Sequence, residues 1–135
     1  MLAEQHPDDV AVTFAAEDHT ETPVTWRELE RRANQMAHFF ESRGLGDGDM
    51  IVVALRNSLE HLYSVFGAWK VGVSVLPLRW DLPEWERDRL LEIAGASLVV
   101  AEWENPAPGT VSPEEIRATT GGTLQLADGL KTIAV

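Results

Sequence analysis

Short runs of hydrophobic residues alternate along this chain with longer segments in which hydrophobic residues recur at helical spacing. Residues 10–15 (VAVTFA) and 23–25 (PVT) are β-rich and separated by polar residues, which predicts a strand pair. A continuous apolar run at residues 51–55 is typical of a strand that is buried on both faces of a parallel sheet. Two further strands are predicted at residues 73–78 and 98–101.

A first helix is predicted to begin at Thr25 and to end near Arg43. Thr25 and Glu28 form a capping-box pattern, in which Glu28 reaches back to the cap's own N–H, and Gly44 is placed to take the left-handed C-terminal position. The polar residues Glu28, Arg31, Arg32 and Glu41 lie off the apolar face. That face consists of Leu29, Ala33, Met36, Ala37 and Phe40.

A second helix is predicted over residues 59–71, with Asn57 and Ser58 as its cap and Gly72 at its end. Gly67 and Ala68 allow close packing in this helix. Its wide apolar face is expected to consist of Leu62, Val65, Phe66 and Trp69.

A third helix places Pro83 in its first turn, leaves Asp81 or Leu82 as an imperfect cap, and ends at Gly95. It turns Leu90, Leu91, Ile93 and Ala94 toward a core. A short helix from Ser112 to about Thr119 and a final strand over residues 130–135 complete the pattern.

Strands that alternate with helices at this spacing predict right-handed βαβ crossovers. The predicted fold class is therefore α/β: a parallel β-sheet flanked by helices and preceded by a short N-terminal strand pair. Residues 1–135 are expected to form a single domain.

Composition excludes several classes of function. With 44% hydrophobic and 24% charged residues, the chain resembles an ordinary globular protein, and its net charge of −11 speaks against binding to nucleic acid or anionic lipid. It has no cysteine. It also has no basic and apolar leader and no apolar run as long as a membrane span, so a cytoplasmic protein is expected.

Five short motifs occur in an order that resembles one enzyme superfamily. They are TWRELERRANQMA at residues 25–37, GLGDGD at 44–49, the pair NS at 57–58, KVG at 70–72 and VLPL at 75–78. This set resembles the front of the adenylate-forming enzymes, the AMP-dependent synthetase and ligase superfamily. The resemblance covers about residues 9–102 and is weaker over 103–135, where the chain ends in an apparently open strand. It implies a partial subdomain of a larger synthetase fold.

The resemblance implies an ATP-dependent ligase that converts a carboxylic acid to an acyl adenylate and then transfers it to CoA. ATP, Mg²⁺ and CoA are thus implied for the complete enzyme. The chain lacks the usual T-S-G-T-T-G-x-P-K-G phosphate loop, so by itself it is expected to be inactive and to hold no catalytic residue.

Two segments depart from the family pattern. Arg56 stands where a proline often precedes the NS pair, and Arg79, Trp80 and Asp81 stand where N-P-R often follows VLPL. The segment RWDLPEWE at residues 79–86 resembles acyl-CoA synthetases for fatty, bile or steroid acids, which makes that branch the expected one.

Candidate contacts to substrate or CoA are Asn57, Ser58, Arg79 and Trp80. They follow the first two parallel strands at their carboxyl ends, where open α/β sheets bind ligands. The structural alternative is that Asn57 and Ser58 only cap a helix and that Trp80 packs under its loop. Trp85 either covers the rim of the core or serves in docking.

Other site chemistries find little support in the sequence. GLGDGD precedes a strand instead of joining a strand to a helix, so it is interpreted as a cap and turn and not as a phosphate loop. The four histidines have no metal-ligand spacing, and the charges of EWERDRLLE are interpreted as an exposed helix face.

An alternative function is a stand-alone binding or assembly module derived from such an enzyme. An isolated half-sheet with apolar faces would associate through a free strand edge or through those faces, so a homo-oligomer is a second expected kind of partner.

Overall fold

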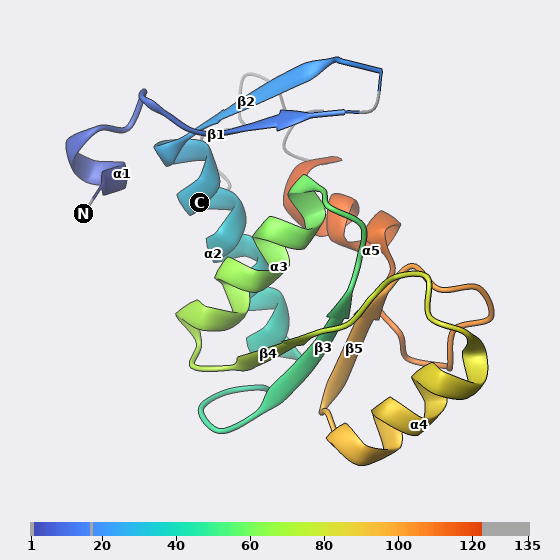
Figure 1. Cartoon of the computed structure of the whole chain (residues 1–135). Helices are drawn as coiled ribbons and strands as arrows, with labels where there is room; N and C mark the ends of the chain where they lie inside the picture. Colours follow the sequence, from blue (N-terminus) through green and yellow to red (C-terminus); the bar gives the residue numbers. More distant parts are fainter. Residues whose placement is uncertain (1, 17, 123–135) are drawn as a thin grey trace.

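The computed structural model describes residues 2–16 and 18–122 and has the predicted α/β architecture (Figure 1). A short helix α1 (Leu2–Gln5), which the hydrophobic pattern did not predict, precedes an antiparallel pair formed by β1 (Val10–Ala15) and β2 (Glu21–Thr25). The strand pair predicted near the N-terminus is therefore confirmed. The strand predicted over residues 130–135 lies outside the described residues.

The main sheet consists of three parallel strands in the order β4-β3-β5. They are β3 (Met50–Ala54), β4 (Ser74–Pro77) and β5 (Leu98–Ala101). The central strand β3 is buried on both faces, as predicted, because its alternate side chains enter two hydrophobic clusters.

Helices cover both faces of this sheet (Figure 1). On one face, α2 (Trp26–Ser42) and α3 (Leu59–Lys70) pack on Ile51 and Val53. On the other, α4 (Glu84–Ala94) lies over the side of β3 that carries Val52 and Ala54. Two short helices, α5 (Pro113–Arg117) and the π-helix η1 (Ala118–Gly122), close the described part of the chain beside α2 and α3.

Helix α2 follows the sequence prediction closely. The Thr25 hydroxyl accepts a 3.1 Å hydrogen bond from the N–H of Glu28, and Gly44 has a left-handed φ of 81°. The Glu28 side chain was expected to reach back to Thr25, but it instead pairs with Arg31 and Arg32. Arg31, expected off the apolar face, is itself buried by these contacts. All five residues of the predicted apolar face are buried.

Helix α3 buries a different face from the predicted one. Its buried residues are Tyr63, Ser64, Gly67 and Ala68, whereas Trp69 is 59% exposed and the other large residues of the predicted face are only partly buried. The cause is the close approach of α2, since a Cβ added at Gly67 would lie 2.5 Å from the Met36 Cβ. Small side chains line this contact, and the large apolar ones are turned outward.

Helix α4 differs most from its prediction. Pro83 is the cap residue and not the first helical residue, and no side chain caps the helix. Ile93 was expected to face the core but is 72% exposed, while Arg87, expected on an exposed face, is the buried residue of the helix. Gly95 ends the helix with a φ of 60°, as predicted.

One edge of the parallel sheet is extended by a single residue. The N–H of Val111 donates to the Val99 carbonyl at 2.9 Å, and the Val111 carbonyl accepts from the N–H of Ala101 at 3.0 Å. Within residues 2–16 and 18–122, β4 has β3 as its only strand neighbour. In that same part of the chain, no helix has the length and apolar character needed to cross a membrane.

Candidate functional site

Three short segments follow the three parallel strands and gather at the carboxyl end of the sheet. They begin at Arg56 after β3, at Arg79 after β4 and at Glu102 after β5. Because strands of an open α/β sheet carry ligand sites at this end, these segments form the candidate site.

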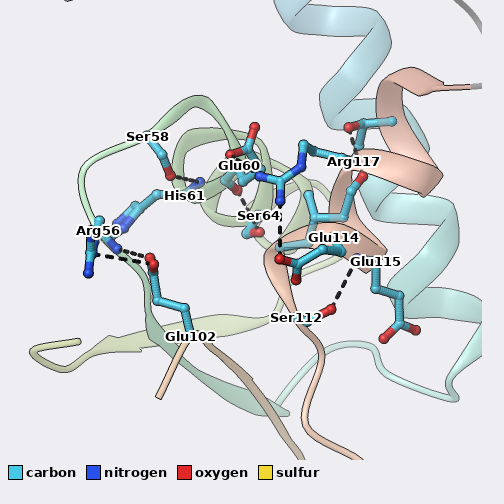
Figure 2. Close-up of polar contacts among 12 residues, drawn as sticks. Arg56, Ser58, Glu60, His61, Ser64, Glu102, Ser112, Glu114, Glu115 and Arg117 are labelled. Carbon is cyan, nitrogen blue, oxygen red and sulfur yellow. Dashed lines mark hydrogen bonds and ion pairs between the residues drawn. The ribbon is translucent and has the colours of Figure 1, made fainter. Parts of the chain in front are cut away.

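An ion pair joins the segments that follow β3 and β5. The backbone N–H of Arg56 donates to one carboxylate oxygen of Glu102, and Arg56 Nε lies 3.5 Å from the other oxygen (Figure 2). The Glu102 side chain is 24% exposed and that of Arg56 is 61% exposed. The pair therefore lies at the mouth of the site.

Two tryptophan side chains connect the segment that follows β4 to the segments that follow β3 and β5. The Arg56 guanidinium carbon lies 4.1 Å from the centroid of the Trp80 ring, a cation–π arrangement. Trp103 is buried, with 7% of its surface exposed. Its Nε1 donates a hydrogen bond to the Arg79 carbonyl at 3.1 Å. The three strand ends are thus connected through side chains.

Arg87 supports the same region from α4. Its guanidinium donates to the carbonyls of Glu104 and Asn105, and its central carbon lies 5.4 Å from the Trp103 ring centroid. This explains why a charged residue is the buried one on α4, since its polar atoms have partners.

A larger cleft, of about 580 Å³, opens on one side of the Arg56–Glu102 pair. Asn57 and Ser58 line it, together with Glu60 and Arg117, which are ion-paired at 3.1 Å (Figure 2). The Arg117–Glu60 pair joins α5 to α3 beside this cleft, and Arg117 also lies 3.3 Å from Glu114 within α5.

A smaller cleft, of about 390 Å³, opens on the other side of the pair. Trp80 and Asp81 line it, with Arg87 and the carboxylate-bearing residues Glu84 and Glu104. Arg56, Glu102 and Trp103 line both clefts.

The four predicted site residues fall into different places. Ser58 caps α3, since its hydroxyl accepts a 3.1 Å hydrogen bond from the N–H of His61, and it also faces the larger cleft with Asn57. Trp80 is 40% exposed in the smaller cleft. The Arg79 side chain lies in neither cleft and instead binds Asp81 through two hydrogen bonds. Contact of these residues with a ligand stays a prediction.

The Arg79–Asp81 pair shifts both titrations. The hydrogen bonds to Asp81 raise the pKa of the Arg79 guanidinium, and those from Arg79 lower the pKa of the Asp81 carboxyl. Both side chains stand in solvent, so this pair is a local surface contact.

The sequence analysis missed the residues that connect the clefts. Glu102 directly follows the third predicted strand, so the rule that selected Asn57 and Arg79 also selects Glu102 and Trp103. Arg56 also carried a signal, since it departs from the family pattern. Arg87 carried none, because an arginine among the charges of a helix resembles an exposed residue.

The structure also bears on the predictions about metal binding, the GLGDGD segment and Trp85. Among residues 2–16 and 18–122, no three His, Asp or Glu side chains are grouped so as to hold a metal ion. GLGDGD forms a turn, in which the Asp49 carboxylate accepts from the N–H of Gly46 at 2.9 Å. Trp85 is 72% exposed, so it does not cover the rim of the core.

A polar cluster of Glu28 and Arg32 from α2 and Tyr63 from α3 lies between these helices. Burial raises the pKa of the Tyr63 hydroxyl to about 12, with the Arg32 charge acting in the opposite direction. Burial also acts to raise the pKa of Glu28, but the hydrogen bonds and charges of Arg32 and Arg31 hold that pKa below its ordinary value.

An apolar groove of about 510 Å³ lies where α1 approaches α2 and α3. Trp69 and Phe66 from α3 and Trp26 from α2 form its walls, and Lys70 pairs with Glu30 at its border. Part of the large apolar face that α3 turns outward therefore lines this groove.

Comparison with known proteins assigns the whole arrangement to a family. The family model described as AMP-binding enzyme matches residues 2–132. Surfactin synthase subunit 2 of Bacillus subtilis is 34% identical over 103 residues, which are 76% of this chain and 3% of that protein. The chain thus spans a small part of the curated relatives that it matches.

Solved structures have the same fold. O-succinylbenzoate coenzyme A synthetase from Bacillus subtilis, in complex with AMP, aligns with a TM-score of 0.73 and 23% identity over 86% of this chain and 31% of that one. NpsA-ThdA from Klebsiella oxytoca, described as an artificially fused adenylation-PCP di-domain NRPS, aligns with a TM-score of 0.74 and 21% identity over 88% of this chain and 22% of that one.

Proposed function

The chain belongs to the AMP-binding enzyme family, and on this basis we propose that it is the N-terminal part of an enzyme that activates a carboxylic acid with ATP. In the proposed reaction, a carboxylate oxygen attacks the α-phosphorus of ATP, which gives an acyl adenylate and releases pyrophosphate. The sulfur of a thiol then attacks the acyl carbon, loses its proton and displaces AMP. The observation that carries the proposal is the family match over residues 2–132.

The described residues support a scaffold role more than a role in phosphate chemistry. A triphosphate needs several free N–H donors and cations, whereas the guanidinium groups of Arg56, Arg87 and Arg117 already pair with carboxylates or carbonyls. In the same part of the chain, no three His, Asp or Glu side chains are grouped so as to hold a metal ion. We therefore assign ATP and Mg²⁺ binding to residues outside the described ranges.

The carboxyl-end clefts are the proposed contribution to the acid or thiol site. Asn57 and Trp80 stand on cleft walls with their side chains accessible, which suits contact with a substrate or CoA. Ser58 would contribute only the part of its hydroxyl not used in capping, and Arg79 would need to leave Asp81. We rank Asn57 and Trp80 above Ser58 and Arg79 as contacts.

CoA is the first candidate for the thiol. It is supported by the segment at residues 79–86, which resembles acyl-CoA synthetases, and by the fold shared with a coenzyme A synthetase. The second candidate is amino-acid activation followed by transfer to a carrier-domain thiol. It is supported by the 34% identity to a surfactin synthase subunit and by the fold shared with an adenylation-PCP protein.

The test is carboxylic-acid-dependent exchange of labelled pyrophosphate into ATP, measured with the complete open reading frame that contains this chain. Panels of amino acids and of fatty, bile and steroid acids separate the two candidates, and CoA thioester formation is measured in parallel. Exchange with amino acids and no thioester would favour the second candidate. The proposal would be refuted if no acid of either panel supported exchange.

The 135-residue chain alone is the natural control, because it lacks the phosphate loop, and we expect no exchange from it. Titration of this chain with ATP, CoA and a fatty acid tests the alternative of a stand-alone binding module. Saturable binding of one of these ligands without turnover would favour that alternative. We propose a cytoplasmic location, because the chain has no cysteine and so needs no oxidising compartment.

A further inference from the structure

Arg56 contacts both neighbouring strand ends with different parts of one residue. Its backbone N–H and its Nε face the Glu102 carboxylate after β5, and its guanidinium plane faces the Trp80 ring after β4. A proline at this position could donate no N–H and could not reach Trp80. We call Arg56, Trp80 and Glu102 the Arg56 latch.

The latch stands between the two clefts. Arg56 and Glu102 line both of them, and Trp80 lines the smaller one. Behind the latch, Trp103 also lines both clefts and is held in place by the Arg79 carbonyl and by Arg87. The clefts therefore share one wall, whose outer part is the Arg56 side chain and whose inner part is Trp103.

The outer part of this wall is exposed and the inner part is buried. The Arg56 side chain is 61% exposed and is held by one carboxylate and one ring face. Trp103 is 7% exposed, and its ring nitrogen is bonded to the backbone. Arg56 and Trp103 are therefore an exposed and a buried part of the lining that the two clefts share.

We propose that Arg56 is a positioning residue that keeps the two clefts separate and, resting on the proposed function, limits the size of the acid or thiol group that the carboxyl end of the sheet accepts. A small ligand occupies one cleft with the latch closed. A ligand that extends into both clefts must displace Arg56 from Trp80 and Glu102.

The test measures access to each tryptophan of the 135-residue chain labelled with 5-fluorotryptophan. The ¹⁹F signals are assigned by single Trp→Phe substitutions, and the small nitroxide TEMPOL serves as the probe of access. We expect Arg56→Ala to raise the TEMPOL relaxation of the Trp103 signal about twofold or more, because both residues line the same two clefts and the arginine stem covers apolar surface there. The signal of Trp85, which is already 72% exposed, should not change and is the internal reference.

Further variants separate positioning from general loosening. Glu102→Gln preserves shape but removes the charge that holds Arg56, so the Trp103 relaxation should also rise. Arg56→Lys retains a cation above Trp80 without the planar group and should give an intermediate value. Arg89→Ala, an equal change of charge on the exposed side of α4, should match the wild type.

Unchanged Trp103 relaxation in folded Arg56→Ala and Glu102→Gln proteins would overturn the proposal. If Arg56→Ala does not fold, the Glu102→Gln result decides. Equal increases at all five tryptophans would also overturn it, because they would indicate global loosening and not the opening of one wall.

Discussion

Tyr63 is the single tyrosine of the chain, so its titration can be observed without interference. Because burial raises its pKa to about 12, the 295 nm absorbance of the folded protein should titrate near that pH. In urea the same transition should move to about 10, the value for an exposed tyrosine. A folded-state midpoint near the urea value would contradict the burial of this hydroxyl between α2 and α3.

The same shift predicts a loss of stability at alkaline pH. The folded state holds the Tyr63 proton more tightly than the unfolded state, so the contribution is complete below about pH 10 and is lost as the pH rises toward 12. We expect the loss to be about 2–3 kcal/mol, because one pKa unit corresponds to about 1.4 kcal/mol. Tyr63→Phe should remove this part of the pH dependence in urea melts.

Gly67→Ala should destabilise the protein although alanine is the better helix former. In an exposed helix this change gains about 1 kcal/mol, but here the new Cβ would lie 2.5 Å from the Met36 Cβ. Overpacking of this kind costs about 1–3 kcal/mol. Gly46→Ala is the control, because its Cβ would meet open space. A gain in the urea midpoint for Gly67→Ala would show that α2 and α3 lie further apart.

At the scale of the element, the cap of α3 separates the two interpretations of the Asn57–Ser58 pair. Ser58→Ala removes the bond to the His61 N–H and should cost about 1 kcal/mol, whereas Ser58→Asp should preserve stability. Asn57 is exposed, so Asn57→Ala should leave the urea midpoint unchanged. An effect of Asn57→Ala on ligand binding would then be a contact effect.

The elements also differ in how far the sequence predicted them. For helix α2, the sequence predicted both the bounds and the apolar residues that are buried, because the apolar stripe and the capping threonine indicate the same helix. For α3, the bounds were predicted but the buried face was wrong, since the large residues define an apolar stripe while the contact with α2 needs small ones. For α4, the pattern failed because Arg87 is buried through its bonds to carbonyls, which hydrophobicity does not encode.

The sequence predicted where the candidate site lies, but it predicted only some of the residues that line it. The rule of the carboxyl ends selected the correct edge of the sheet, and Asn57 and Trp80 do line clefts there. The rule does not tell which side chain of a segment turns inward. Arg79 turns out to Asp81, while its neighbours in space, Arg56 and Trp103, form the wall.

At the scale of the molecule, the outward apolar face of α3 and the groove beside it predict self-association of the isolated chain. Sedimentation velocity over a range of concentrations should detect it, and Trp69→Gln should weaken it because Trp69 is a wall of the groove. Trp85→Gln, an equally neutral change at an exposed tryptophan far from that groove, is the control. A wild-type chain that stays monomeric at high concentration would contradict this prediction.

The single-residue bridge at Val111 determines what kind of assembly the sheet itself could form. Val111 already bonds to the backbone of β5, whereas β4 has a free edge within the described residues. Two copies that joined through their sheets would therefore pair β4 with β4 across a two-fold axis. Such a contact uses the same edge in both partners, so growth through β4 would stop at a closed dimer and would not proceed to a filament.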